Sequence, residues 1–455
     1  MSTHGFTTRL VQSARAASAT SRTTPIYLTA GFPFDDLDAA AAHFTEGAGY
    51  AYTRIQNPTI ETVERNLAAL EGGSQAILLA SGQAATVTAL LAIVGAGQHI
   101  VCSTHIYEGT RGLLRDSLAR FGIAVDFISE IDDPDAWRRA SRPETRAWFA
   151  ESISNATNIV LDTATIAAAA RERGIPLVVD NTFATPYLLR PLEQGAEVVV
   201  HSASKFLAGQ GAVLGGVIVD SGRFDPEASG ALFPHLVESP RPGVPSVAER
   251  TGGDARIAYA REVIAARFGA TPSPISAFLI GQGIETLSLR VERQSANALA
   301  VARWLETQPE VARVDYAGLP SHASHPLAQR VFERGYGSVF QFTLNGGAAA
   351  AQAFVEAVSV FTHMTHLGDV RSLVLHPAST SHALLSADER AAVGVQPGSL
   401  RVSIGIEDVA DLIDDLRRAL DASAGAVSVA ADLPGAVEAP ASISPASVEP
   451  AVVVA

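Results

Sequence analysis

The sequence predicts an α/β protein with a mostly parallel central sheet and a smaller second domain of α+β type. Short apolar runs alternate with longer helical patterns along the first half of the chain, the order expected when helices connect parallel strands. Two of the runs, Leu177-Val178-Val179 and Val198-Val199-Val200, are apolar without interruption, as in strands covered on both faces. The length of 455 residues is more than one ordinary domain needs.

The strands of the large domain are predicted at seven short β-branched or apolar runs, namely Ala76–Ala80, His99–Ser103, Val125–Ile128, Ala147–Glu151, Leu177–Asp180, Val198–Ser202 and Gly216–Val219. The segments between them carry helical periodicity, most clearly at Thr59–Leu70, Gln83–Val94, Gly109–Phe121 and Thr163–Arg173. We expect this large domain to occupy residues 59–285.

The second half of the chain begins with a Pro- and Gly-rich stretch from Phe233 to Gly253, after which a long helical pattern runs to about Trp304. A smaller domain over 286–422 is predicted, with strands at Val311–Tyr316, Ser338–Leu344 and Leu400–Ile406 and a last helix at Val409–Ala422. From Ser423 onward Ala, Val, Ser and Pro predominate without an amphipathic pattern, so residues 423–455 are predicted to be a disordered tail.

Charge and composition exclude several classes of protein. The formal net charge is −14, which disfavours binding to nucleic acids and anionic membranes. Cys102 is the only cysteine, so we expect no intrachain disulfide and no cysteine metal cluster, and core packing is its expected role. Met1 to Arg22 contain no continuous apolar segment, and Ala84–Val94 is too short to span a bilayer. A cytoplasmic location is expected.

Lys205 is the only lysine among the 33 basic residues. An amine can lose its proton and attack a carbonyl, whereas a guanidinium stays protonated. A coding bias toward arginine would leave the same composition. The residues around Lys205 must therefore show whether this lysine has a chemical role.

Ligands of open parallel sheets bind beyond the carboxyl ends of the strands. There the sequence places Ser81-Gly82-Gln83, Tyr107, Asp180, and Ser202 and Ser204 just before Lys205. Individually these residues also suit a helix cap, core packing or a turn. Together, a hydroxyl pair for a phosphate, a carboxylate for a pyridinium nitrogen and a lysine for an imine describe a pyridoxal phosphate (PLP) site.

Six segments, in order, resemble the Cys/Met-metabolism PLP-dependent enzymes, which have an aminotransferase-like fold of type I. They are Tyr52–Thr59, Leu70–Gly73, Ser81–Ala85, Asp180–Pro186, His201–Lys205 and Leu400–Asp408, and the resemblance extends from about residue 5 to 421. Within the family, Gly368–His382 and Tyr52–Ile55 are most similar to O-acetylhomoserine sulfhydrylases.

The resemblance implies a role for each matching residue. Lys205 would hold the cofactor and move protons, and Tyr107 would stack on its ring and assist proton transfer. Asp180 would pair with the ring nitrogen, Asn155 would contact the ring hydroxyl, and Arg401 would bind the substrate carboxylate together with Asn155 and Tyr52. The phosphate would be bound by Gly82, Gln83, Ser202 and Ser204, and by Tyr52 and Arg54 of a neighbouring subunit. Residues 1–58 would therefore form an arm that completes a neighbouring site in a homo-oligomer, expected to be a tetramer.

The implied reaction is γ-replacement on O-acetyl-L-homoserine by sulfide or a thiol, giving homocysteine or methionine and acetate, without a metal. The alternatives in the same class are cystathionine γ-synthase or γ-lyase and methionine γ-lyase. A non-catalytic PLP-binding regulatory protein is the alternative of another class, against which the complete set Lys205, Asp180 and Arg401 argues.

Four positions depart from the family pattern. Glu108 and Ala156 stand where Gly and Pro are usual, Gln210 replaces a common His, and His366 replaces a smaller polar residue. These changes bear on the substrate rather than on the cofactor, and His366 could alter the acyl preference or transfer a proton.

Overall fold

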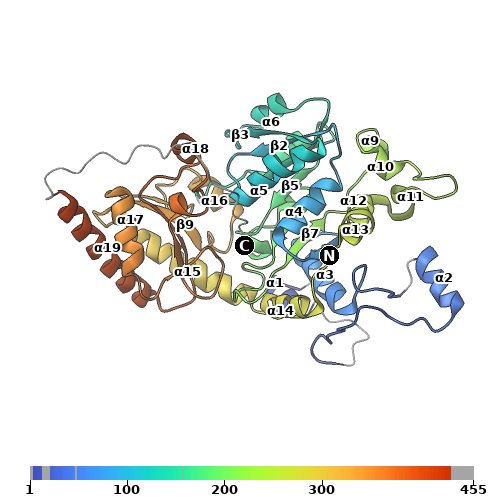
Figure 1. Cartoon of the computed structure of the whole chain (residues 1–455), viewed down its shortest axis with the longest axis horizontal. Helices are drawn as coiled ribbons and strands as arrows, with labels where there is room; N and C mark the ends of the chain where they lie inside the picture. Colours follow the sequence, from blue (N-terminus) through green and yellow to red (C-terminus); the bar gives the residue numbers. More distant parts are fainter. Residues whose placement is uncertain (1–3, 13–20, 47–48, 156, 432–455) are drawn as a thin grey trace, which may run out of the picture.

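A seven-stranded sheet forms the centre of the larger part of the molecule (Figure 1). The computed structural model describes residues 4–12, 21–46, 49–155 and 157–431. In spatial order the strands are β1, β7, β6, β5, β4, β2 and β3. Their bounds are β1 Gln75–Leu79, β2 His99–Ser103, β3 Ala124–Ile128, β4 Thr145–Glu151, β5 Leu177–Asp180, β6 Val198–Ser202 and β7 Gly216–Asp220. The pairs from β3 to β6 are parallel, and β7 runs antiparallel to both β6 and β1. The predicted large-domain sheet is confirmed, with ends shifted by at most two residues.

Helices pack on both faces of this sheet. Along β7, Val217 and Val219 belong to a core cluster with residues of α3 (Pro58–Glu71) and α14 (Pro274–Glu285). The intervening Ile218 belongs to a second cluster with residues of α4 (Gly82–Leu91) and α12 (Ala255–Tyr259). Burial on both faces explains why the central strands read as uninterrupted apolar runs.

The other helices of this part of the chain are short. They are α1 Phe6–Gln12, α2 Leu37–Glu46, α5 Glu108–Gly112, α6 Pro134–Ala140, α7 Thr163–Arg171, α8 Thr185–Leu188, α9 Pro226–Ser229, α10 Pro234–Val237, α11 Val247–Thr251 and α13 Ala266–Phe268. The predicted helix Gly109–Phe121 is instead α5, a π turn at Leu113–Ser117 and a 3-10 turn at Leu118–Phe121. Gly109 and Gly112 weaken the regular α-helical pattern there.

The smaller part of the molecule contains a five-stranded sheet in the order β10, β11, β12, β9 and β8. Its elements are α15 Leu287–Leu305, β8 Val311–Asp315, α16 His325–Val331, β9 Val339–Leu344, α17 Gly347–Ala357, β10 Thr362–His363, β11 Leu373–Leu375, α18 Ala387–Ala392, β12 Ser399–Ser403 and α19 Val409–Ala431. The three predicted strands are present, whereas β10 and β11 are too short to give a periodic signal. Residues Leu287 and Val291 of α15 pack in the large core, and Val301 and Leu305 pack under the smaller sheet, so this helix joins the two parts.

The two ends of the described chain differ from the predicted organisation. Within the predicted arm, Phe6 and Leu10 of α1 are buried in the large core, while α2 lies apart from the sheets (Figure 1). The prediction of disorder from Ser423 is wrong as far as Ala431, because α19 continues to that residue. Alanine-rich sequence readily extends a helix that has already formed. Residues 432–455 of the predicted tail lie outside the described residues.

None of the helices in the described part of the chain combines the length and apolar composition needed to cross a membrane.

Candidate active site

A cavity of about 240 Å³ lies at the carboxyl ends of the central strands and contains Lys205. Most of the predicted site residues line this cavity, namely Gly82, Gln83, Tyr107, Asn155, Asp180, Ser202, Ser204, Lys205 and Arg401. They come from the starts of α4 and α5, from the ends of β4, β5 and β6 and the segments that follow them, and from β12 of the smaller sheet. The cavity therefore forms where the two parts of the molecule meet.

Lys205 lies just after β6, and its amine is largely buried. Burial, and secondarily the charge of Arg401, lower the pKa of Lys205 to about 8. The Nζ atom is 3.3 Å from Nδ1 of His366. Lys205 is thus an amine that loses its proton more easily than an exposed lysine does.

Asp180 ends β5, and Glu151 ends the neighbouring strand β4. Asp180 Oδ1 accepts a hydrogen bond from the Thr182 backbone N–H at 2.9 Å. Burial raises the pKa of Asp180, and burial together with the nearby charge of Asp180 raises the pKa of Glu151 well above its usual value. Two buried carboxyl groups at the carboxyl ends of neighbouring strands would be stabilised in their ionised form by a cationic partner such as a protonated ring nitrogen.

The start of α4 is shaped for close approach by a ligand. Ser81 caps the helix by accepting from the Ala84 N–H at 3.1 Å. A Cβ at Gly82 would lie only 2.7 Å from Cβ of Ser202, so only glycine fits. The adjacent Gln83 has a buried Oε1 without a partner among the described residues. The free backbone N–H groups of the first helical turn, where Gly82 allows close approach, are suited to an anion such as a phosphate, whereas the Gln83 Oε1 is an acceptor and would need a donor.

Ser202 and Ser204 differ in their surroundings. The Ser202 backbone N–H donates to Thr182 Oγ1 at 2.8 Å, which ties the ends of β5 and β6 together. The Ser204 hydroxyl accepts from the Gly215 N–H at 3.0 Å and lies 3.3 Å from the Gly215 carbonyl. The Ser204 hydroxyl is therefore already engaged by the backbone.

Arg401 brings a buried guanidinium from β12 of the smaller sheet to the cavity. It donates to Asn155 Oδ1 at 3.3 Å and to the carbonyl oxygens of Thr365 and His366 at 3.4 and 3.2 Å. Burial lowers the pKa of Arg401 to about 10, so the group remains a cation at neutral pH. A buried cation paired only with neutral oxygens is suited to receive a carboxylate.

Tyr107 precedes α5 and is half exposed at the mouth of the cavity. Its backbone N–H donates to Glu151 Oε1 at 2.6 Å, and the Asn155 N–H donates to Glu151 Oε2 at 3.1 Å. Glu151 thus fixes the backbone of two predicted site residues. A Cβ at Gly109 would lie only 2.4 Å from the Tyr107 ring. The absence of a side chain at Gly109 therefore leaves room for this ring.

The residues that depart from the family pattern lie in different environments. The Glu108 carboxylate pairs with Arg111 at 3.0 Å, and burial raises the pKa of Glu108. The Gln210 carbonyl accepts from Arg371 at 2.8 Å. Only His366 among them lines the cavity; Ala156 is outside the described residues.

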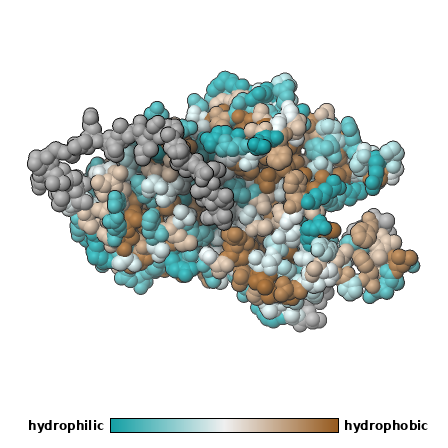
Figure 2. All heavy atoms as spheres, viewed as in Figure 1, coloured by the Kyte–Doolittle hydropathy of each residue, from teal (hydrophilic) through white to brown (hydrophobic). Residues whose placement is uncertain are grey.

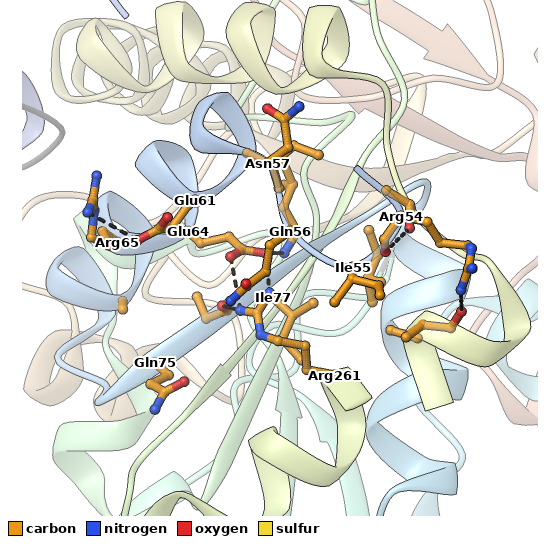
Figure 3. A pocket seen from close by; sticks show the side chains of 18 of the residues that line it. Arg54, Ile55, Gln56, Asn57, Glu61, Glu64, Arg65, Gln75, Ile77 and Arg261 are labelled. Atoms are coloured by element: carbon orange, nitrogen blue, oxygen red, sulfur yellow. Dashed lines mark hydrogen bonds and ion pairs between the residues drawn. The ribbon is translucent and has the colours of Figure 1, made fainter. Parts of the chain in front are cut away.

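Tyr52 and Arg54 do not line the Lys205 cavity. Arg54 lines a separate cavity of about 430 Å³ beside α3 and β1, shown in Figure 3 with Glu64 and Arg261, which form an ion pair of 2.9 Å. The Arg54 guanidinium lies 5.3 Å from the centre of the Tyr52 ring and donates to the Ala266 carbonyl. One chain by itself does not bring these two residues to Lys205.

The cavity also contains residues that the sequence did not predict as site residues, among them Glu151, Thr182, Phe183 and Thr365. Glu151 could have been found by the rule that located Asp180, because both end parallel strands. Thr182 and Phe183 lie inside the segment Asp180–Pro186 that resembles the family, and no local signal marks Thr365.

The sequence profile of the Cys/Met metabolism PLP-dependent enzymes matches residues 7–421, and the chain belongs to this family. Among its relatives is an O-acetyl-L-homoserine sulfhydrylase of Leptospira meyeri, 40% identical over 424 residues, which cover 89% of this chain and 93% of that protein. O-acetyl-L-homoserine sulfhydrylase 1 of Thermus thermophilus is 43% identical over 404 residues, covering 88% and 95%.

A solved structure from Campylobacter jejuni, assigned as an O-acetylhomoserine (thiol)-lyase and containing a pyridoxyl-lysine phosphate, has a TM-score of 0.86. It is 33% identical, and the match covers 92% of this chain and all of that one. The chain is therefore a PLP-dependent enzyme of the aminotransferase-like fold. The cavity agrees with this cofactor, because it offers an amine, a buried carboxyl pair and the N-terminus of α4, where the absence of a side chain at Gly82 leaves room for a phosphate.

Proposed function

We propose that this enzyme replaces the γ-acetoxy group of O-acetyl-L-homoserine with sulfide or a thiol. The Cγ–O bond breaks, a Cγ–S bond forms, and the products are acetate and homocysteine, or methionine when the thiol is methanethiol. The observation that carries the proposal is that one cavity holds the Lys205 amine, the Asp180 carboxyl group and the Arg401 guanidinium. The names of the relatives agree with this reaction.

Lys205 is proposed to move the protons. Pyridoxal phosphate, when bound, supplies an electron sink that stabilises negative charge on carbons near the substrate amino group. Nζ of Lys205, with a pKa of about 8, is close enough to neutral pH to accept a proton from Cα and to return it to the carbon skeleton.

The remaining residues are proposed to bind and orient. Arg401 receives the substrate carboxylate, with Asn155 and the partner copy of Tyr52 beside it, and Asn155 also contacts the cofactor hydroxyl. Asp180 pairs with the ring nitrogen, Tyr107 stacks on the ring and assists proton transfer, and the phosphate is bound by Gly82, Gln83, Ser202 and Ser204. The placement of Ser204 against Gly215 favours a positioning role for its hydroxyl.

We further propose a homotetramer located in the cytoplasm, in which Tyr52 and Arg54 reach the cofactor phosphate of a neighbouring subunit. Two observations support self-association. Large apolar side chains are exposed on the N-terminal segment and on α14, namely Leu28, Leu37, Phe44, Ile275 and Leu279, and Figure 2 shows apolar surface over α14. In addition, Arg54 lies away from the cavity of its own chain.

We also propose a division of residues 1–422 into three parts. Residues 1–58 contain the arm that serves the neighbouring site, 59–285 form the cofactor domain and 286–422 form the smaller domain. The break between α14 and α15 at Thr286 supports the second boundary.

A product assay tests the reaction. O-acetylhomoserine with sulfide is compared with O-succinylhomoserine, O-acetylserine, cystathionine and methionine, each with the purified cofactor-loaded enzyme. Homocysteine formed efficiently from the first pair alone is the expected result. A preference for O-succinylhomoserine with cysteine, or cleavage of cystathionine or methionine, would instead identify a γ-synthase or a γ-lyase and overturn the proposal.

A further inference from the structure

The Lys205 amine contacts a histidine that comes from the smaller part of the molecule. His366 Nδ1 lies 3.3 Å from Lys205 Nζ, and both side chains line the cavity. The two residues lie 161 positions apart in the sequence, so only the folded chain brings them together.

The protonation of the two partners determines the direction of the hydrogen bond. Burial first, and the charge of Lys205 second, lower the pKa of His366 to about 4, so its ring is neutral at pH 7. Lys205, with a pKa of about 8, is then mostly an ammonium group and can only donate. His366 Nδ1 must therefore accept, and the ring proton resides on Nε2.

His366 Nε2 is buried and has no hydrogen-bond partner in the described part of the chain. The charged groups that influence the ring have other partners. The Asp369 carboxylate accepts from the Arg371 Nε at 3.0 Å, and Arg401 donates to Asn155 and to backbone carbonyls. A buried N–H donor without an acceptor is unfavourable unless a ligand supplies one.

We propose that His366 is a positioning residue that holds the free Lys205 amine through Nδ1 and offers its Nε2–H to the acyl oxygen of the substrate. The second contact rests on the proposed function, because only an ester substrate brings such an oxygen. When the Cγ–O bond breaks, the electron pair goes to the departing carboxylate. Acetate is a weak base, so it leaves as an anion and His366 stabilises it by hydrogen bonding without losing its proton.

Two substitutions distinguish the role of Nδ1 of His366 from that of Nε2. His366→Asn places an oxygen close to the position of Nδ1 and removes Nε2, whereas His366→Leu removes both polar atoms. In the full-length protein freed of cofactor, the rate at which an amine-directed succinimidyl ester labels Lys205 is measured against pH. Because Lys205 is the only lysine, the mass of its peptide reports on one side chain.

The labelling rate of wild type and of His366→Asn is expected to rise with an inflection near pH 8, following the pKa of about 8 of Lys205. In His366→Leu the ammonium form loses its acceptor, and the inflection moves to lower pH. An unchanged inflection in a Leu variant that still binds cofactor overturns the contact with Lys205. If the Leu variant does not fold, an inflection in His366→Asn that differs from that of wild type overturns the contact instead. This experiment does not depend on the identity of the substrate.

The role of Nε2 is tested with two substrates and sulfide. L-Vinylglycine gives homocysteine without losing an acyl group, so it needs no donor to a leaving oxygen. His366→Asn is expected to lower kcat/KM for O-acetylhomoserine by about tenfold more than for vinylglycine, the effect of one hydrogen bond to a developing charge. Equal losses with both substrates overturn this contact. If wild type makes no homocysteine from O-acetylhomoserine, the proposed function itself is wrong, whatever the labelling result.

Discussion

Lys205 is held in a setting that favours its neutral amine, with burial and the Arg401 cation both acting against its positive charge. We predict that Lys205→Ala and Lys205→Arg both lose the visible absorbance of the lysine-bound cofactor and at least about 10²–10⁴ of the turnover rate, the usual contribution of a proton-transferring group. Absorbance spectroscopy of the cofactor-loaded variants provides the measurement.

The Arg variant is the matched control, because it keeps the positive charge and much of the length of the side chain. An intact absorbance band in Lys205→Arg would mean that another amine holds the cofactor, and would remove Lys205 from the mechanism.

The buried carboxyl group of Asp180 is predicted to cost stability until the cofactor binds. Burial raises its pKa in the folded protein, so the folded state binds more protons than the unfolded state between the two pKa values. Stability therefore falls as the pH rises through that interval. Asp180→Asn should raise the melting temperature of the cofactor-free protein at pH 7 and weaken cofactor binding by about ten- to a hundredfold, the loss of one charge-assisted hydrogen bond.

Thermal unfolding with and without pyridoxal phosphate, together with a cofactor titration, checks both halves of the Asp180 prediction. A variant that is destabilised without cofactor, or that binds the cofactor as tightly as wild type, would contradict it.

At the scale of elements, the approach of α4 to β6 sets the geometry of the phosphate side of the cavity. Because a Cβ at Gly82 would lie 2.7 Å from Ser202 Cβ, Gly82→Ala must push the helix and the strand apart. We expect a loss of about 1–3 kcal/mol in stability, as for other overpacked sites, and weaker cofactor binding.

Gly95→Ala is the control for Gly82→Ala, since the nearest atom to an added Cβ there, Gln98 Oε1, is 3.9 Å away. Chemical denaturation and cofactor titration of both variants give the comparison. Equal behaviour of the two would show that α4 is not held against β6 as described.

Elements and side chains were not equally predictable from the sequence. The strands β2, β5 and β6 have the predicted bounds because their apolar runs end sharply at polar residues, and these ends located Asp180 and Ser202. The contact between Lys205 and His366 joins residues separated by 161 positions and leaves no local pattern. The sequence did not predict the helical continuation beyond Ala422, because the low-complexity composition there is typical of a disordered tail, although alanine has the highest helix propensity.

At the scale of the whole molecule, Arg54 lines a cavity separate from that of Lys205, as expected for a residue that completes the site of a neighbouring subunit. If Arg54 serves a neighbouring subunit, Arg54→Ala should weaken cofactor binding, and unchanged affinity would count against shared sites. A mixing experiment tests the sharing itself.

Subunits carrying Lys205→Ala are co-refolded with subunits carrying Arg54→Ala, each inactive or impaired alone. In a mixed pair, one site receives Lys205 from one subunit and Arg54 from the other, so activity should reappear. Each variant refolded alone is the control. Absence of any recovery in mixed oligomers, verified by differently tagged subunits, would place both residues in the same subunit's site.

The meeting of the two sheets around Lys205 also has a consequence for the order of folding. Arg401 reaches Asn155 across 246 positions of the chain, and β1 cannot pair until β7, near residue 216, has been made. Contacts this distant in sequence form late and slowly. A nascent chain therefore has no finished pocket until nearly all of it has been synthesised, and cofactor capture should be one of the last events of maturation.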